Sequence, residues 1–172
     1  MSARITSTES EALERFPAVA ADFCGLIDDF GRLGRAQLVR ELSVHIARLF
    51  EVAMFLPSVE PATENLEDYT SESLPAHTKE WANLSDNLRR VFEPYDTYWE
   101  VFDPTTREEP VSCSLAIDVA EIYQDLRDAL NLQNSGAAEN DIHWQWHFDF
   151  HQHWGRHASG ALRALLHISN FA

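Results

Sequence analysis

The sequence contains few basic residues, and this deficit limits the partners it can bind. Its 172 residues include 28 acidic side chains but only 13 lysines and arginines, which gives a formal net charge of −15. Binding to nucleic acids and to anionic membrane surfaces depends on clustered basic side chains. We therefore expect neither kind of partner. The charge either keeps the protein soluble or attracts a metal cation or a basic partner, and the sequence leaves both open.

Cysteine and long apolar runs are also scarce. Cys24 and Cys113 lie far apart within helical patterns, so they form neither a disulfide framework nor a zinc ribbon. The apolar runs are too short to cross a bilayer, and residues 1–10 lack the apolar core of a secretory signal. We therefore expect a cytoplasmic protein, with residues 1–172 forming a single domain.

Apolar residues recur at helical spacing along most of the chain, and no strand-like alternation or internal repeat is present. Residues 57–76 are rich in Pro, Ser, Thr and acids, which predicts a long surface loop. The aromatic stretch 95–102 is predicted to be helix or turn. The predicted fold class is all-α, a single antiparallel helical bundle of about five helices. The predicted helical segments are 11–30, 35–56, 78–92, 114–130 and 137–169. Ser114 is a candidate N-cap of the fourth segment, and Gly155 and Gly160 are candidate kinks or close-contact points in the last.

The run H-W-Q-W-H-F-D-F-H-Q-H-W-G-R-H (143–157) is the densest group of chemically active side chains. On a continuous helix, His143, His147 and His151 are only ~40° apart and share the face that is apolar further along. This spacing predicts that His147 and His151 point toward the core. His153 and His157 form a second pair, roughly a third of a turn away.

Histidines four residues apart can bind one metal ion from one helix face. The alternative is that these rings pack among the tryptophans and form hydrogen bonds with carboxylates or backbone. An acidic stripe comprising Asp118, Glu121, Asp125 and Asp128 has no lysine or arginine to offset its repulsion. Water, a cation or protonated histidines on a neighbouring helix could relieve that repulsion.

His45 lies within a leucine stripe, with Glu41 one turn earlier. It is either a hydrogen-bonded core residue or a ligand. If the functional interpretation holds, carboxylates and imidazoles from three helices form a site for a divalent transition metal, although the Glu-x-x-His pair of di-iron bundles is absent. The candidate metal ligands are His147, His151, Asp118, Asp125, His45 and Glu41.

No catalytic motif fixes a reaction, because the G-x-S-x-G elbow, the P-loop and the dinucleotide fingerprint are all absent. The sequence therefore favours a non-enzymatic protein, and it assigns no catalytic residue and no organic cofactor. Two hypotheses remain. One is an acidic accessory domain that binds a protein partner, and the other is a metal-binding bundle or metal-dependent enzyme.

Several phrases of the sequence resemble a family of bacterial proteins described only as a domain of unknown function. They are Y-W-E-V-F-D-P (98–104), L-A-I-D-V-A-E-I-Y-Q-D-L (115–126) and W-Q-W-H-F-D-F-H-Q-H-W-G-R-H-A (144–158). The resemblance covers nearly the whole chain and is most specific at H-W-G-x-H (153–157). It implies a single all-α cytoplasmic domain and supplies no activity. In that family we expect an aspartate where this chain has Glu121.

Overall fold

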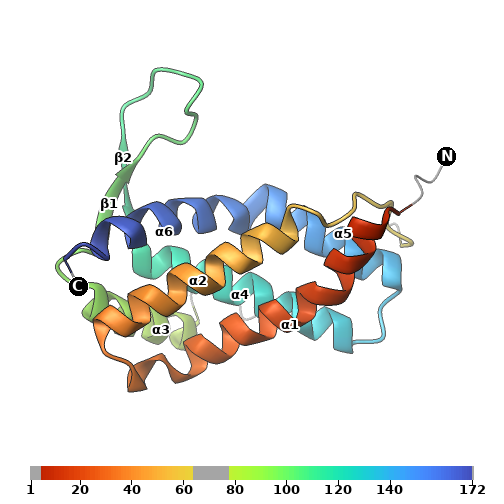
Figure 1. Cartoon of the computed structure of the whole chain (residues 1–172), viewed down its shortest axis with the longest axis horizontal. Coiled ribbons are helices and arrows are strands. Elements are labelled where there is room, and N and C mark those ends of the chain that lie inside the picture. Colours follow the sequence, from red (N-terminus) through yellow and green to blue (C-terminus); the bar gives the residue numbers. More distant parts are fainter. Residues whose placement is uncertain (1–4, 64–77, 172) are drawn as a thin grey trace.

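The structure, a computed structural model, describes residues 5–63 and 78–171. It confirms the all-α fold class (Figure 1). The predicted loop 57–76 lies largely outside the described residues, and the single domain stays a prediction. The helices are α1 (Ser7–Asp29), α2 (Arg35–Ala53), α3 (Lys79–Phe92), α4 (Leu115–Asn134), α5 (Glu139–Asp149) and α6 (Gly155–Ile168), with a 3-10 turn η1 (Phe30–Arg32) and a π-helical turn η3 (Phe150–Trp154).

Side-chain caps explain where several helices begin. Thr6 and Glu9 form a reciprocal capping box, so α1 begins at Ser7 and runs through Pro17. The predicted start at residue 11 was therefore four residues late. Ser114, the predicted cap of α4, accepts a hydrogen bond from the backbone N–H of Ile117 at 3.3 Å. Thr78 caps α3 in the same way.

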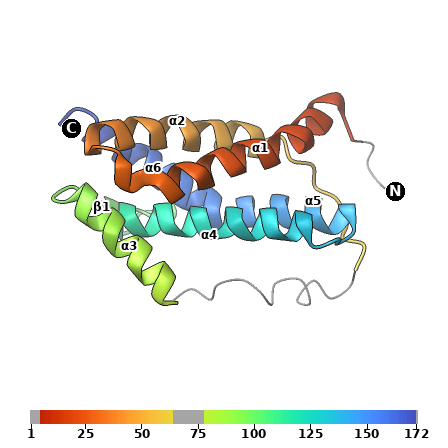
Figure 2. The ribbon, with the colours of Figure 1, turned by 90° about the horizontal axis from the view of Figure 1, so that it is seen from below.

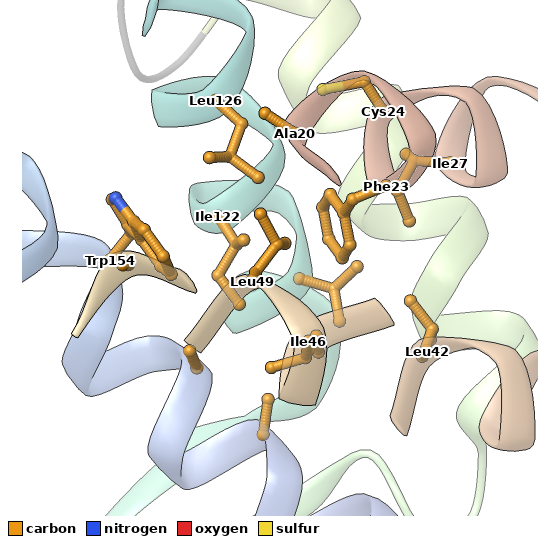
Figure 3. Close-up of a cluster of buried hydrophobic side chains, with 14 of the residues drawn as sticks. Ala20, Phe23, Cys24, Ile27, Leu42, Ile46, Leu49, Ile122, Leu126 and Trp154 are labelled. Carbon is orange, nitrogen blue, oxygen red and sulfur yellow. The ribbon is translucent and has the colours of Figure 1, made fainter. Parts of the chain in front are cut away.

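The core lies where the long helices meet. Helix α1 packs against α2 and α4, and α6 packs against the same two helices. Figure 2 shows α1 and α2 along one side of the molecule and α4 along the other. Phe23, Leu49 and Ile122 from three different helices come together with Trp154 in this core (Figure 3). Burial of each such side chain contributes roughly 1.5–3 kcal/mol. Among the described residues, no helix combines the length and the apolar character needed to span a membrane.

A short hairpin corrects the prediction that the chain has no strands. Strand β1 (Thr97–Glu100) pairs antiparallel with β2 (Val111–Ser114). Strands of four residues are too short to show a clear alternation, although Thr, Tyr, Trp and Val favour strands. The hairpin is joined to the start of α4 by Asp96, which accepts hydrogen bonds from the Ser114 hydroxyl and the Ala116 N–H, both at 2.8 Å.

The last predicted helix is interrupted by the π-turn η3. The N–H of Gly155 bonds to the carbonyl oxygen of Phe150, five residues earlier. A Cβ atom at position 155 would collide with that same oxygen, so the wide turn requires glycine there. The turn holds one residue more than an α-helical turn. The extra residue shifts the helical phase between α5 and α6. A different set of α5 residues therefore lies on the same side as the core-facing residues of α6.

Asp141 fixes the segment before the undescribed residues onto α5. This fully buried carboxylate accepts hydrogen bonds from the backbone N–H groups of Ala62, at 2.6 Å, and Thr63, at 3.0 Å. The hydrogen bonds from Thr63 hold the pKa of Asp141 below its usual value. The beginning of the predicted surface loop is thus attached to the helical body.

Candidate functional site

A polar seam joins α4 to η3 and α6. We use "the seam" for the carboxylates Asp118, Glu121 and Asp125 together with His153 and His157. The two histidines are one helical turn apart, and their ring centroids are separated by 4.9 Å. The acidic stripe predicted from the sequence therefore turns toward the histidine run.

At one end of the seam, His157 and Tyr98 share the carboxylate of Asp118. The Nδ1 atom of His157 lies 2.8 Å from Oδ1, and the Tyr98 hydroxyl donates to Oδ2 at 2.7 Å. Because a carboxylate oxygen accepts, His157 donates from Nδ1–H in this contact. The Asp118 side chain is only 8% exposed, so these contacts compensate for the loss of water. Burial, and then the Asp118 charge, raise the pKa of Tyr98.

At the other end, His153 binds Asp125. Its Nδ1 atom is 2.7 Å from Oδ2 of Asp125, and its Nε2 atom is 4.0 Å from Oε2 of Glu121. The hydrogen bond to Asp125 raises the pKa of His153, and the charges of the neighbouring carboxylates act in the same direction. This imidazole therefore keeps its proton at a higher pH than a free histidine does.

Asp149 lies beside the seam and carries a shifted carboxyl. Burial, and then the nearby Asp125 charge, raise the pKa of Asp149 to about 7, although a 2.7 Å hydrogen bond from Gln145 opposes the shift. Its charge changes near neutral pH, as that of an ordinary histidine does. The sequence does not predict this role, because nothing local distinguishes a half-buried aspartate between two phenylalanines.

Gly160 lets the hairpin approach α6. A Cβ atom at this position would collide with the hydroxyl of Tyr98 and would lie 2.9 Å from Oε2 of Glu100. Nearby on the same helix, Arg163 donates to the carbonyl oxygen of Trp99 at 3.1 Å and lies 3.7 Å from Glu100. Of the two roles predicted for Gly160, a kink or a close contact, the structure shows the close contact.

The structure divides the predicted metal ligands among separate places. Asp118 and Asp125 lie in the seam, but their partners are His157 and His153. His147 and His151 contact each other instead, with ring centroids 4.4 Å apart. The prediction that His151 points to the core is wrong, because its side chain is exposed.

The π-turn is the reason for that error. On a continuous helix, the core-facing side of α6 would continue through His151 and His147, and both would be buried. With one extra residue in η3, the buried positions of α5 move back by one, to Ile142, Trp146 and Phe150. The histidines His143, His147 and His151 each follow one of these positions and lie beside the core.

The remaining candidates, His45 and Glu41, are half-buried on α2. Glu41 lies 3.5 Å from Arg40 in an exposed ion pair. Among residues 5–63 and 78–171, no group of three or more His, Cys, Asp or Glu side chains is placed to hold a metal ion. Metal binding by the six predicted ligands therefore stays a prediction.

The cysteines do not add a nucleophile to the site. Burial raises the pKa of the Cys24 thiol to about 12 and also raises that of Cys113. Because the thiolate is the reactive form, both are poor nucleophiles at neutral pH. The chemistry that the site supports is therefore hydrogen bonding and proton exchange at imidazole and carboxyl groups.

Comparisons with known proteins agree with the fold and assign no activity. No curated protein matches the chain. A crystal structure of protein BF1032 from Bacteroides fragilis, a structural genomics target, is similar in fold, with a TM-score of 0.72 and 23% sequence identity. The match covers 92% of this chain and 95% of that one. The model of the family described as "Domain of unknown function (DUF5063)" matches residues 7–170. This chain therefore belongs to the DUF5063 family.

Proposed function

We propose that this chain is a non-enzymatic accessory domain that binds a partner protein through its β1–β2 hairpin. The observation that carries the proposal is the exposure of two large aromatic side chains there. Trp99 is 65% exposed and Phe102 is 62% exposed, on an element that projects away from the helices (Figure 1). Apolar side chains gathered on a protruding surface are typical of protein interaction sites, and Trp is enriched among the strongest contacts.

The hairpin is held in place before any partner binds. Its pleat turns Tyr98 and Glu100 toward the helices, where they contact Asp118 and Arg163. The intervening residue, Trp99, has its side chain on the other face of the strand and is largely exposed. An aromatic side chain that is already positioned loses less entropy on binding. The seam thus supports the proposed interaction by anchoring the hairpin.

The charge of the hairpin loop indicates the chemistry of the partner. Asp103, Glu108 and Glu109 lie in residues 101–110, against the single basic side chain of Arg107. Asp103 also orders the turn by accepting hydrogen bonds from the N–H and hydroxyl of Thr105. We therefore expect a partner surface with an apolar pocket surrounded by lysine or arginine.

Matched variants test this proposal. The full chain and its Phe102→Ser variant would be used to capture proteins from the source cells, with Phe148→Ser, on an exposed position of α5, as the control. A protein that depends on Phe102 but not on Phe148 would then be purified. Its dissociation constant for Phe102→Ser should be at least about tenfold higher than for the unmodified chain. The dissociation constant for the unmodified chain should increase with salt concentration. Identical captures, or equal affinities for both variants, would refute the proposal.

Metal binding is a second candidate function, favoured by the geometry of the two seam histidines. His153 and His157 each use Nδ1 to bind a carboxylate, as metal-binding histidines often do, and this leaves Nε2 for a metal. Water would have to supply remaining ligands. Elemental analysis after expression with added zinc, nickel or manganese, with and without chelator, tests this. A content far below one metal per chain would exclude this candidate.

A further inference from the structure

We infer that the cleft between β1 and the end of α6 binds a small organic anion with a flat, apolar body. This site shares Trp99 with the proposed protein contact, but it takes a small molecule and does not involve Phe102. The cleft has a volume of about 330 Å³, near the lower end of the usual range for small-molecule sites. Its lining residues are Pro94, Tyr95, Thr97, Tyr98, Trp99, Arg163, Ala164, His167 and Ile168.

The charge of the cleft differs from that of the rest of the molecule. The chain carries a net charge of −15, yet the residues that line the cleft include no aspartate or glutamate. Arg163 and His167 stand one helical turn apart on α6, so both can donate hydrogen bonds from the same side. The nearby carboxylate of Glu100 lies 3.7 Å from Nη2 of Arg163 but does not line the cleft. The groups that do line it therefore favour an anion.

Arg163 retains donors for a ligand. Its contacts with the Trp99 carbonyl oxygen and with Glu100 both use the same nitrogen, Nη2. The N–H groups of Nη1 and Nε are not used in these contacts. A guanidinium held in place at one nitrogen can bind a carboxylate through its other N–H groups. The protein contacts thus orient Arg163 without consuming its binding capacity.

The walls of the cleft are aromatic, and one of them packs against a further ring. Tyr95 stacks on Phe171, with centroids 6.0 Å apart and planes at 17°, and Phe171 also contacts the His167 ring. On the other wall, the indole of Trp99 is largely exposed. A planar ligand could cover this indole and recover the apolar contact it lacks. Aromatic walls beside a guanidinium favour a one- or two-ring carboxylate.

The experiment uses indole-3-acetate as the probe and its neutral amide, indole-3-acetamide, as the matched comparison. Binding to the full chain would be followed by NMR through the indole N–H signal of Trp99 and the Nε–H signal of Arg163. We expect a saturable shift with a dissociation constant below about 1 mM. The amide should bind at least about tenfold more weakly. No saturable shift, or equal affinity for acid and amide, would overturn the inference.

Two variants separate this site from general surface charge. Arg163→Gln and His167→Gln should each weaken binding of the acid, the first by about tenfold or more. Arg156→Gln is the control, since Arg156 lies on the same helix but bonds to the Gln152 carbonyl oxygen outside the cleft. An equal loss with Arg156→Gln would contradict the assignment. Phe102→Ser should leave probe binding unchanged, so this test can fail independently of the proposed function.

Discussion

Two pairs of histidines in one short stretch behave differently. His147 lies in α5 and His157 in α6, whereas His151 and His153 lie two residues apart in η3. Both pairs have the same spacing and similar ring separations. The rings of the first pair contact each other, and His151 also contacts the ring of Phe150. Each member of the second pair instead contacts a carboxylate of α4.

The different neighbours shift the pKa values of the two pairs in opposite directions, as His147 and His153 show. Burial, with a smaller effect of His151, lowers the pKa of His147. The hydrogen bond to Asp125 raises the pKa of His153. Spacing along a helix therefore does not determine the chemistry of a histidine pair. The side chains on the neighbouring helix do.

The largest expected effect comes from Gly155→Ala, which disrupts the π-turn η3 that contains one member of each pair. The added Cβ would collide with the Phe150 carbonyl oxygen, which belongs to the backbone and cannot rotate aside. We expect the free energy of unfolding to fall by about 3 kcal/mol in denaturant titrations. The control is Gly25→Ala, in the middle of α1 with nothing within 4 Å, which should gain up to about 1 kcal/mol. Similar effects at both positions would show that η3 does not require glycine.

Asp118→Asn should come next, because it removes the carboxylate of the second pair. The asparagine can accept the Tyr98 hydroxyl, but its amide N–H₂ then faces the Nδ1–H of His157. We expect a loss of about 2 kcal/mol in the free energy of unfolding. Asp22→Asn, on an exposed position of α1, should change stability by less than about 0.5 kcal/mol. Equal losses would mean that the seam contributes nothing specific.

Asp149→Asn tests the carboxyl that is influenced by Asp125 and by His153 of the second pair. The folded-state pKa of about 7 lies above the usual 3.8. The contribution of this group to stability is therefore complete below pH 3.8 and is lost as pH rises from there through 7. The neutral asparagine avoids the cost of a buried charge beside Asp125. We expect the variant to gain about 1 kcal/mol over the wild type near pH 8 and less near pH 6. A gain independent of pH would refute this account.

The smallest effects separate the two pairs directly. Because the pKa of His153 is raised, its stabilising contribution is complete below its unfolded value of 6.5 and is lost as pH rises through the folded value. His153→Gln should therefore cost more stability near pH 5.5 than near pH 7.5. His147 has a lowered pKa, so His147→Gln should be relatively more favourable at the lower pH. For each variant, the change in stability relative to the wild type should differ between the two pH values by less than about 1 kcal/mol. If this difference had the same sign for both variants, the two histidine pairs would not differ in their pKa shifts.

The fold class could be predicted from the sequence because helical spacing is repeated over many residues. The N-cap at Ser114 and the close contact at Gly160 were also recoverable, since each depends on one residue type. The hairpin was missed because its strands have only four residues each. The π-turn was missed because apolar spacing on both sides is regular, and a single extra residue only changes their relative phase.

The site was predicted only in part. The acidic stripe contains Asp118 and Asp125, and histidines on a neighbouring helix were one of its three expected partners. Which histidines contact this stripe depends on the π-turn. A continuous helix predicts His147 and His151, whereas the structure places His153 and His157 there. Tyr98 and Asp149 carry no signal in the sequence, because their roles come from contacts across the fold.

The five-residue turn at η3 also has a consequence for the history of the chain. A π-turn is the mark that a single-residue insertion leaves when a helix keeps the packing on both sides of it. If one residue were deleted between Phe150 and Gly155, the chain could form a continuous helix, but α6 would then rotate by about 100° relative to α5. Either Trp146 or Ala161 would leave the core. Relatives without this residue should therefore have changed the buried positions on one side of the turn, and those with it should retain a glycine where this chain has Gly155.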